Sequence, residues 1–264
     1  MANYQLSDVV EYRTRSHINI YDSPKCDRLA TQAAAGRHLV FFDPPQPPSA
    51  PQGPNKGERD DREEVDSVVQ SDTTAVMVRL CEDDYPGWLD DRDLELLEVA
   101  QTVYHPEVLS EAQIRDKLPR AIEFADRAMQ QSNYYLWGGT VGPNYDCSGL
   151  MQAAFVSAGI WLPRDAYQQE AFTKPVSNIS DLEPGDLVFF GTPEKATHVG
   201  LYLGGNRYIH SSGKAQGRNG IGIDILSEDG DEVSRNYYQQ LRGYGKVVAS
   251  YQSACREWGI GNRA

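Results

Sequence analysis

The sequence predicts two structural units, a small all-β barrel followed by an α+β domain. Short β-type runs separated by turn signals fill the first part, whereas the second part begins with helical periodicity and continues with alternating apolar runs. The chain of 264 residues is long enough for two cores. We place the barrel at 1–100, a linker at 101–109, the α+β domain at 110–251 and a tail at 252–264.

Three short runs carry the barrel prediction. HINIY (17–21), HLVFF (38–42) and AVMVRL (75–80) are typical of short strands, and an acidic turn leads on to YPGWL (85–89). Between them, residues 43–66 are dense in Pro and then in charge, with almost nothing apolar to bury. We expect this segment to be an exposed insertion in the barrel, because long surface insertions cost little stability.

The second unit is expected to open with helices over residues 110–132. Ser110 can cap the first helix, and apolar residues fall near one stripe at Ile114, Leu118, Ile122, Ala125 and Met129. Pro119 lies within this pattern. Because a proline inside a helix removes a donor and clashes with the preceding turn, we expect it to divide the region into two helices.

The stretch from Asn133 to Ile160 carries the candidate nucleophile, Cys147. A Gly/Pro/Asn turn segment delivers this cysteine to the start of an apolar run of helical period, which predicts a helix buried on one side with Cys147 in its first turn. A helix N-terminus favours the thiolate, so we expect a pre-activated sulfur. The alternative is that Cys147 is a buried small hydrophobe, as free cysteines usually are.

Two histidines follow in strand-like runs, His198 in ATHVGLYLGG and His210 in RYIHSSG. The turn at 204–206 would join these strands into a hairpin and bring both imidazoles to one side of the sheet. A nucleophile, a base and an orienting group form the arrangement of a cysteine hydrolase. Further strands are expected at 187–190 and 221–223, and the run at 244–251 is expected to close the sheet.

Five segments in order resemble the motifs of the NlpC-type cell-wall cysteine peptidases: YLWGG (135–139), DCSG (146–149), GDLVFF (185–190), HVGLY (198–202) and IH (209–210). A helix followed by antiparallel strands is also similar to the papain-like α+β layout. Residues from about 8 to 100, including INIYDSP and YPGWL, resemble the bacterial SH3-like barrels that often accompany such hydrolases.

The chemistry assigns His198 as the general base and His210 as the group that fixes its tautomer. The oxyanion would be held by the backbone N–H of Cys147 and, as the resemblance implies, by Tyr135. No metal or organic cofactor is expected.

The resemblance also implies a substrate. Members that pair an SH3-like domain with this peptidase cut stem peptides of peptidoglycan after γ-D-glutamate, at the diamino acid, when the L-alanine amine is free. Asp146, Ser148 and Asp165 match substrate-binding positions, and Tyr85 matches the aromatic that walls off the site beyond the amine. One departure is Ala166, where many relatives have Ser. Asp165 could instead cap the helix that follows it.

The net charge, the first residues and the cysteine spacing argue against several other classes of protein. With 38 acidic against 25 basic residues the net charge is −13, which opposes binding to nucleic acid or anionic membranes. The start of the chain does not resemble a secretory signal, and its four cysteines lack paired spacing, so we expect a cytoplasmic protein with reduced thiols.

We therefore expect a peptidase acting on murein-derived peptides in cell-wall recycling. The alternatives are an amidase or acyltransferase on the same layout, and a wall-binding module without catalysis.

Overall fold

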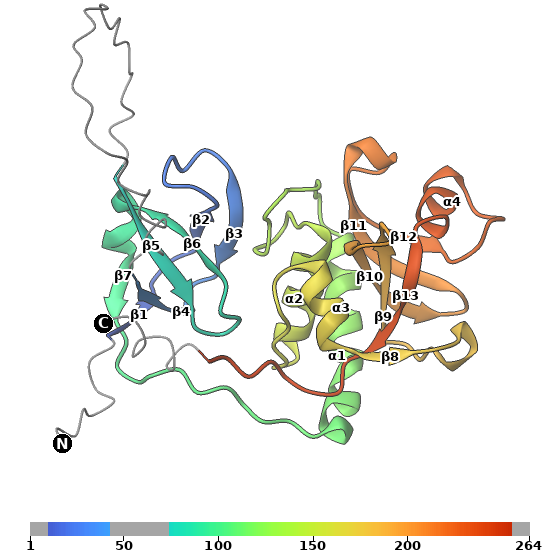
Figure 1. The fold of residues 1–264 in the computed structure, drawn as a ribbon, viewed down its shortest axis with the longest axis horizontal. Helices are drawn as coiled ribbons and strands as arrows, with labels where there is room; N and C mark the ends of the chain where they lie inside the picture. The colour runs from blue at the N-terminus through green and yellow to red at the C-terminus, as the bar shows by residue number, and fades with distance from the viewer. Residues whose placement is uncertain (1–9, 43–73, 255–264) are drawn as a thin grey trace, which may run out of the picture.

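The computed structural model of the protein describes residues 10–42 and 74–254, which form two antiparallel sheets in series (Figure 1). The predicted Pro-rich insertion at 43–66 lies outside the described residues. Among those described, no helix is both long and apolar enough to cross a membrane.

The N-terminal sheet has seven strands in the order β3-β2-β6-β5-β4-β1-β7. Its elements are β1 (Glu11–Thr14), β2 (Ile18–Tyr21), β3 (Leu29–Ala33), β4 (His38–Phe41), β5 (Ala75–Leu80), β6 (Pro86–Asp90), the 3-10 helix η1 (Asp91–Leu96) and β7 (Leu97–Val99). The predicted strands are present, and side chains from β2 to β6 share one core. The expected closed barrel is not seen in the described residues, because β3 and β7 end the sheet without pairing to each other.

The second sheet has six strands in the order β12-β11-β10-β9-β13-β8. Its strands are β8 (Lys174–Val176), β9 (Leu187–Gly191), β10 (Ala196–Gly204), β11 (Arg207–Ser212), β12 (Gly220–Ile225) and β13 (Leu241–Lys246). The helices of this unit are α1 (Glu111–Met129), α2 (Cys147–Ser157), α3 (Ala166–Phe172) and α4 (Glu232–Tyr238). Two short 3-10 helices, η2 (Ile179–Asp181) and η3 (Lys214–Gln216), complete it. The predicted β10–β11 hairpin is confirmed. The last strand begins earlier than expected and lies between β9 and β8 rather than at the edge.

Helices cover both faces of this sheet. One core joins α1 and α2 to β9, β10 and β11, and a second core joins other side chains of the same strands to α4. In Figure 1, α2 and α3 lie on the side of the sheet toward the N-terminal unit, and α4 lies on the opposite side. The face toward the N-terminal unit is therefore the one that carries the helix with Cys147.

Helix α1 departs from the expected break at Pro119. Ser110 forms a capping box with Gln113 as expected, but the helix continues through the proline to Met129. The missing donor frees the carbonyl of Arg115, and both residues are exposed, so water can satisfy that carbonyl. Burial of Leu118 and Ala121 on either side keeps the two halves packed on one core.

The two units are joined a second time near the C-terminus. The segment after β13 runs back to the N-terminal sheet (Figure 1). There the carboxylate of Asp84 accepts hydrogen bonds from the Ser253 hydroxyl at 2.7 Å, the Ala254 N–H at 2.9 Å and the Tyr251 hydroxyl at 3.2 Å. We call residues 250–254 the C-terminal strap.

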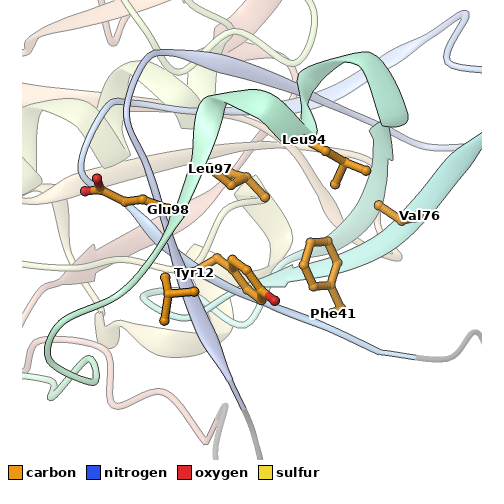
Figure 2. Close-up of a pocket in the computed structure, with 7 residues that line it drawn as sticks. Tyr12, Phe41, Val76, Leu94, Leu97 and Glu98 are labelled. Atoms are coloured by element: carbon orange, nitrogen blue, oxygen red, sulfur yellow. The ribbon is translucent and has the colours of Figure 1, made fainter.

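A pocket of about 480 Å³ opens on the N-terminal sheet, where Figure 2 shows the side chains that line it. Its lining is mostly apolar and includes Tyr12, Phe41, Leu94 and Leu97. None of the predicted site residues lines this pocket.

Candidate active site

Cys147 occupies the first turn of α2, as predicted, with Asp146 as the N-cap residue. The Asp146 carboxylate accepts from the Gly149 N–H at 2.7 Å, which satisfies one of the free donors of the first turn. Gly149 is required here, because a Cβ on it would lie 2.0 Å from the Gly139 carbonyl oxygen. The aromatic-glycine loop therefore packs directly on the turn that carries the cysteine.

The helix is buried more completely than the expected single face. Its buried residues include Cys147, Ser148, Leu150 and Gln152, which point in different directions around the axis. Gln152 explains the second face, since its amide donates to Asp83 of the N-terminal unit at 2.8 Å. The N-terminal unit thus covers a side of α2 that sequence periodicity leaves polar.

The expected pre-activated thiolate is wrong for this resting structure. Cys147 is 6% exposed, and burial, followed by the charge of Asp146, raises the pKa of its thiol to about 12. Hydrogen bonds from the N–H groups of Val199 and Ser148 to the sulfur act in the opposite direction and do not overcome burial. They do place the sulfur against β10, at the residue next to His198.

His198 and His210 lie together on the hairpin, as predicted. His198 Nε2 is 2.6 Å from His210 Nδ1, and His210 Nε2 is 2.6 Å from Asp224 Oδ2 on β12. Gly200 provides the space for this approach, since a Cβ there would lie 2.6 Å from the Tyr208 ring and 3.3 Å from the His210 Cβ. The result is a buried line of three side chains from β10, β11 and β12.

Burial controls the protonation of this line. It lowers the pKa of His198 well below its ordinary value, and the neighbouring His210 lowers it further. The ring of Tyr237 stacks on His198 with centroids 4.3 Å apart, which holds the base in one plane. The His198 imidazole and the Cys147 thiol are therefore both neutral at physiological pH.

Arg164 is the buried cation of the site. Its guanidinium donates to Asp146 at 2.6 Å and 3.1 Å, to the Ser148 hydroxyl at 2.9 Å and to the Thr31 hydroxyl of β3 at 2.9 Å. Asp146 also accepts from the Gly138 N–H at 2.9 Å. Asp146 and Ser148 are thus bonded within the protein, where Asp146 caps α2 and both residues hold Arg164. That they bind substrate stays a prediction.

The other predicted residues lie around this centre. Tyr135 is half-buried, and after burial the largest influence raising the pKa of its phenol is Cys147, which places its ring near the sulfur. Burial raises the pKa of Tyr85 to about 12, with Asp165 as the next largest cause, so the N-terminal unit brings Tyr85 close to Asp165.

Asp165 occupies the N-cap position of α3, where its N–H donates to the Gln168 side chain at 3.0 Å. Burial raises the pKa of this carboxyl. Within residues 10–42 and 74–254, its carboxylate forms no ion pair, unlike that of Asp146. Ala166, in the first turn of α3, is buried.

Two residues were missed by sequence reasoning. Asp224 completes the line of histidines; alternation in GIGIDI places it on the face opposite the isoleucines, which gives no signal that it is buried. Arg164 has no local signal, because the Thr31 side chain that it bonds lies 133 residues away.

Part of the chain that holds this site is similar to known proteins. Residues 132–242 match the model of the NlpC/P60 family. The matching segment is 42% identical over 96 residues to gamma-D-glutamyl-L-lysine dipeptidyl-peptidase of Bacillus subtilis (strain 168), covering 35% of this chain and 30% of that protein. It is 37% identical over 103 residues to murein DD-endopeptidase MepS/murein LD-carboxypeptidase of Escherichia coli (strain K12), covering 37% and 54%. The chain thus spans about half, or less, of these relatives.

Solved structures with looser similarity include the peptidoglycan hydrolase RipB of Mycobacterium tuberculosis, at 24% identity and a TM-score of 0.42 over 53% of this chain and 69% of that chain. NlpC1 of Trichomonas vaginalis aligns over 92% of this chain and 70% of its own, at 17% identity and a TM-score of 0.40.

The raised thiol pKa predicts the pH dependence of alkylation. Because the pKa of Cys147 lies near 12, its thiolate fraction and its rate of reaction with iodoacetamide should keep rising with pH beyond pH 9. Mass spectrometry of the tryptic peptide, with Cys147→Ala as the background, measures this rate. A plateau between pH 5 and 8 would instead reveal a thiolate–imidazolium pair.

The bond between Arg164 and Thr31 predicts a stability effect across the two units. Thr31→Val leaves a buried guanidinium donor without a partner, which should lower the free energy of unfolding by about 1–3 kcal/mol. Urea unfolding measures the change, and Thr197→Val, at an exposed strand position, is the matched control expected within about 0.5 kcal/mol of wild type. Equal stabilities for the two variants would contradict the role of Thr31.

Proposed function

We propose that the NlpC/P60 family domain formed by residues 132–242 makes this protein a cysteine peptidase that cuts peptidoglycan stem peptides between γ-D-glutamate and the diamino acid. The observation that carries the proposal is the hydrogen bond of the Cys147 sulfur with the N–H of Val199, next in the chain to His198, which itself pairs with His210. The relative from Bacillus subtilis, whose name specifies a γ-D-glutamyl-L-lysine bond, supports the choice of bond.

In the proposed reaction, His198 Nδ1 takes the proton of the Cys147 thiol while the sulfur attacks the γ-carbonyl carbon. The Cys147 N–H and the Tyr135 hydroxyl stabilise the oxyanion of the tetrahedral intermediate. His198 then gives its proton to the departing amine, and a thioester forms. Water, deprotonated by His198, hydrolyses that thioester and restores the thiol.

The neutral resting pair makes the first proton transfer part of the attack. Because the thiol and the imidazole both resist charging, a separated thiolate and imidazolium are unfavourable before substrate arrives. Negative charge then develops only when the carbonyl oxygen of the substrate is present to accept part of it.

We assign substrate choice to Asp165, whose pKa is raised by burial although the charges of Arg164 and Lys195 act to lower it. Asp165 is half-buried and forms no ion pair in the described parts of the chain, so a ligand ammonium would relieve its burial cost. We assign it the free α-amine of the N-terminal L-alanine. Tyr85, from the N-terminal unit, would close the space beyond that amine.

The N-terminal sheet is, in this proposal, an SH3-like unit that limits the length of peptide on the amine side. The physiological setting we propose is the recycling of murein-derived peptides in the cytoplasm. The relative from Escherichia coli is named for DD-endopeptidase and LD-carboxypeptidase activities, so the bond cut must be measured directly.

The deciding experiment uses a synthetic L-Ala-γ-D-Glu-diaminopimelate peptide, its L-lysine counterpart and N-acetylated versions of both. Mass analysis should find L-Ala-D-Glu and the free diamino acid from the uncapped peptides, and no product from Cys147→Ala. Equal cutting of the acetylated peptides would contradict recognition of the amine. Transfer of the acyl group to an added amine would identify an acyltransferase.

Asp165 gives a prediction for affinity rather than rate. Asp165→Asn removes the charge that pairs with the substrate ammonium, so KM for the uncapped peptide should rise about 10–100-fold with kcat little changed. Asp116→Asn, an exposed change of the same charge on α1, should leave KM unchanged. An unaltered KM in Asp165→Asn would leave the carboxylate with its helix-capping role alone.

A further inference from the structure

Asp224 lies at the end of the histidine line, away from the sulfur, and is almost completely buried at 3% exposure. Its two oxygens have different partners. Oδ2 faces His210 Nε2 at 2.6 Å, and Oδ1 accepts from the Ser234 hydroxyl at 3.2 Å and from Arg218 Nη2. Arg218 Nε lies 3.2 Å from Oδ2, so the guanidinium donates to both oxygens.

This environment keeps Asp224 an anion. Burial acts to raise the pKa of its carboxyl, but hydrogen bonds from His210 and Arg218 and the charge of Arg218 outweigh burial and lower it. An anionic carboxylate can only accept hydrogen bonds. The nitrogen of His210 that faces it must therefore carry a proton.

The direction of every later bond in the line follows from that proton. Burial lowers the pKa of His210, so its ring is neutral and carries one N–H. With that proton on Nε2, its Nδ1 can only accept, and the partner nitrogen, His198 Nε2, must donate. His198 is neutral for the same reason, so its proton on Nε2 leaves Nδ1 bare.

We propose that Asp224, gripped by Arg218 and Ser234, is a positioning residue that sets the tautomers of His210 and His198 and so keeps the base nitrogen of His198 free to take the thiol proton. This inference rests on the proposed function only for its catalytic consequence. The tautomers themselves are properties of the protein without substrate.

Asp224→Asn provides a sharp test because the side chains have the same shape. Arg218 Nη2 and the Ser234 hydroxyl hold the amide oxygen at the Oδ1 position. The NH₂ then takes the Oδ2 position, where it displaces only the 3.2 Å bond from Arg218 Nε and faces His210 Nε2. That nitrogen must then accept, which moves the His210 proton to Nδ1 and forces the His198 proton to its own Nδ1. The base nitrogen becomes occupied.

The measurement is nitrogen NMR of protein with ¹⁵N-labelled histidines, of which the chain has five. The two-bond couplings distinguish Nδ1–H rings from Nε2–H rings. The wild type should show Nε2–H for His198 and His210, and Asp224→Asn should show Nδ1–H for both. A wild-type His210 with its proton on Nδ1, or unchanged rings in Asp224→Asn, would overturn the proposal.

Activity is the second readout. In Asp224→Asn, kcat/KM should fall by up to about 10⁴-fold, as when an inverted histidine tautomer disables a serine-protease triad. Asp231→Asn is the matched control, because Asp231 lies 3.9 Å from the same Arg218 but is 62% exposed and does not contact His210. The control should keep the wild-type rings. If the wild type cuts no peptide, the proposed function fails while the NMR result still decides this inference.

Discussion

The buried ion pair between Arg164 and Asp146 is the interaction on which the rest of the site depends. Arg164 is 2% exposed, and its donors end on the cap of the nucleophile helix and on Thr31 of the N-terminal sheet. Removal of one partner from such a pair costs about 3–5 kcal/mol, because it leaves the other charge buried and unpaired. The first turn of α2 is therefore positioned by a side chain that both units must satisfy.

The same burial governs the chemistry. It raises the pKa of the Cys147 thiol and lowers that of His198, so the protein without substrate holds a neutral pair. Oxidation of a cysteine follows its thiolate character and exposure. In the proposed reaction, a site that stays uncharged until a carbonyl is present would consequently be protected from oxidation between turnovers, and its sulfur would be less reactive at rest.

Local sequence signals predicted the elements and their order well. The Ser110 cap, the helix beginning at Cys147 and the hairpin that unites His198 with His210 each depend on neighbours within about twelve residues. The predictions that were wrong concern features that depend on contacts beyond the local sequence. Helix continuation at Pro119 depends on which face meets water.

The role of Arg164 depends on Thr31 of the other unit, and the protonation of Cys147 depends on burial and on Val199 of a distant strand, which no short window of sequence contains. The role of Asp224 likewise depends on its neighbours in the folded sheet. Alternation places it opposite the isoleucines of its own strand, so its burial and its bond to His210 follow only from pairing with the adjacent strand. Closure of the N-terminal sheet also depends on pairing of distant strands, and the short runs did not determine it.

The C-terminal strap and the turn that receives it change how the two units can evolve. Asp83 bonds the nucleophile helix, Asp84 bonds the strap, and Gln32 of β3 bonds the backbone of Thr140. Domains that are joined only by a linker can be exchanged between proteins during evolution. Here side chains of one unit bond to residues of the other. A chimera that exchanged one unit would therefore also need the matching contact residues on the unit that it kept.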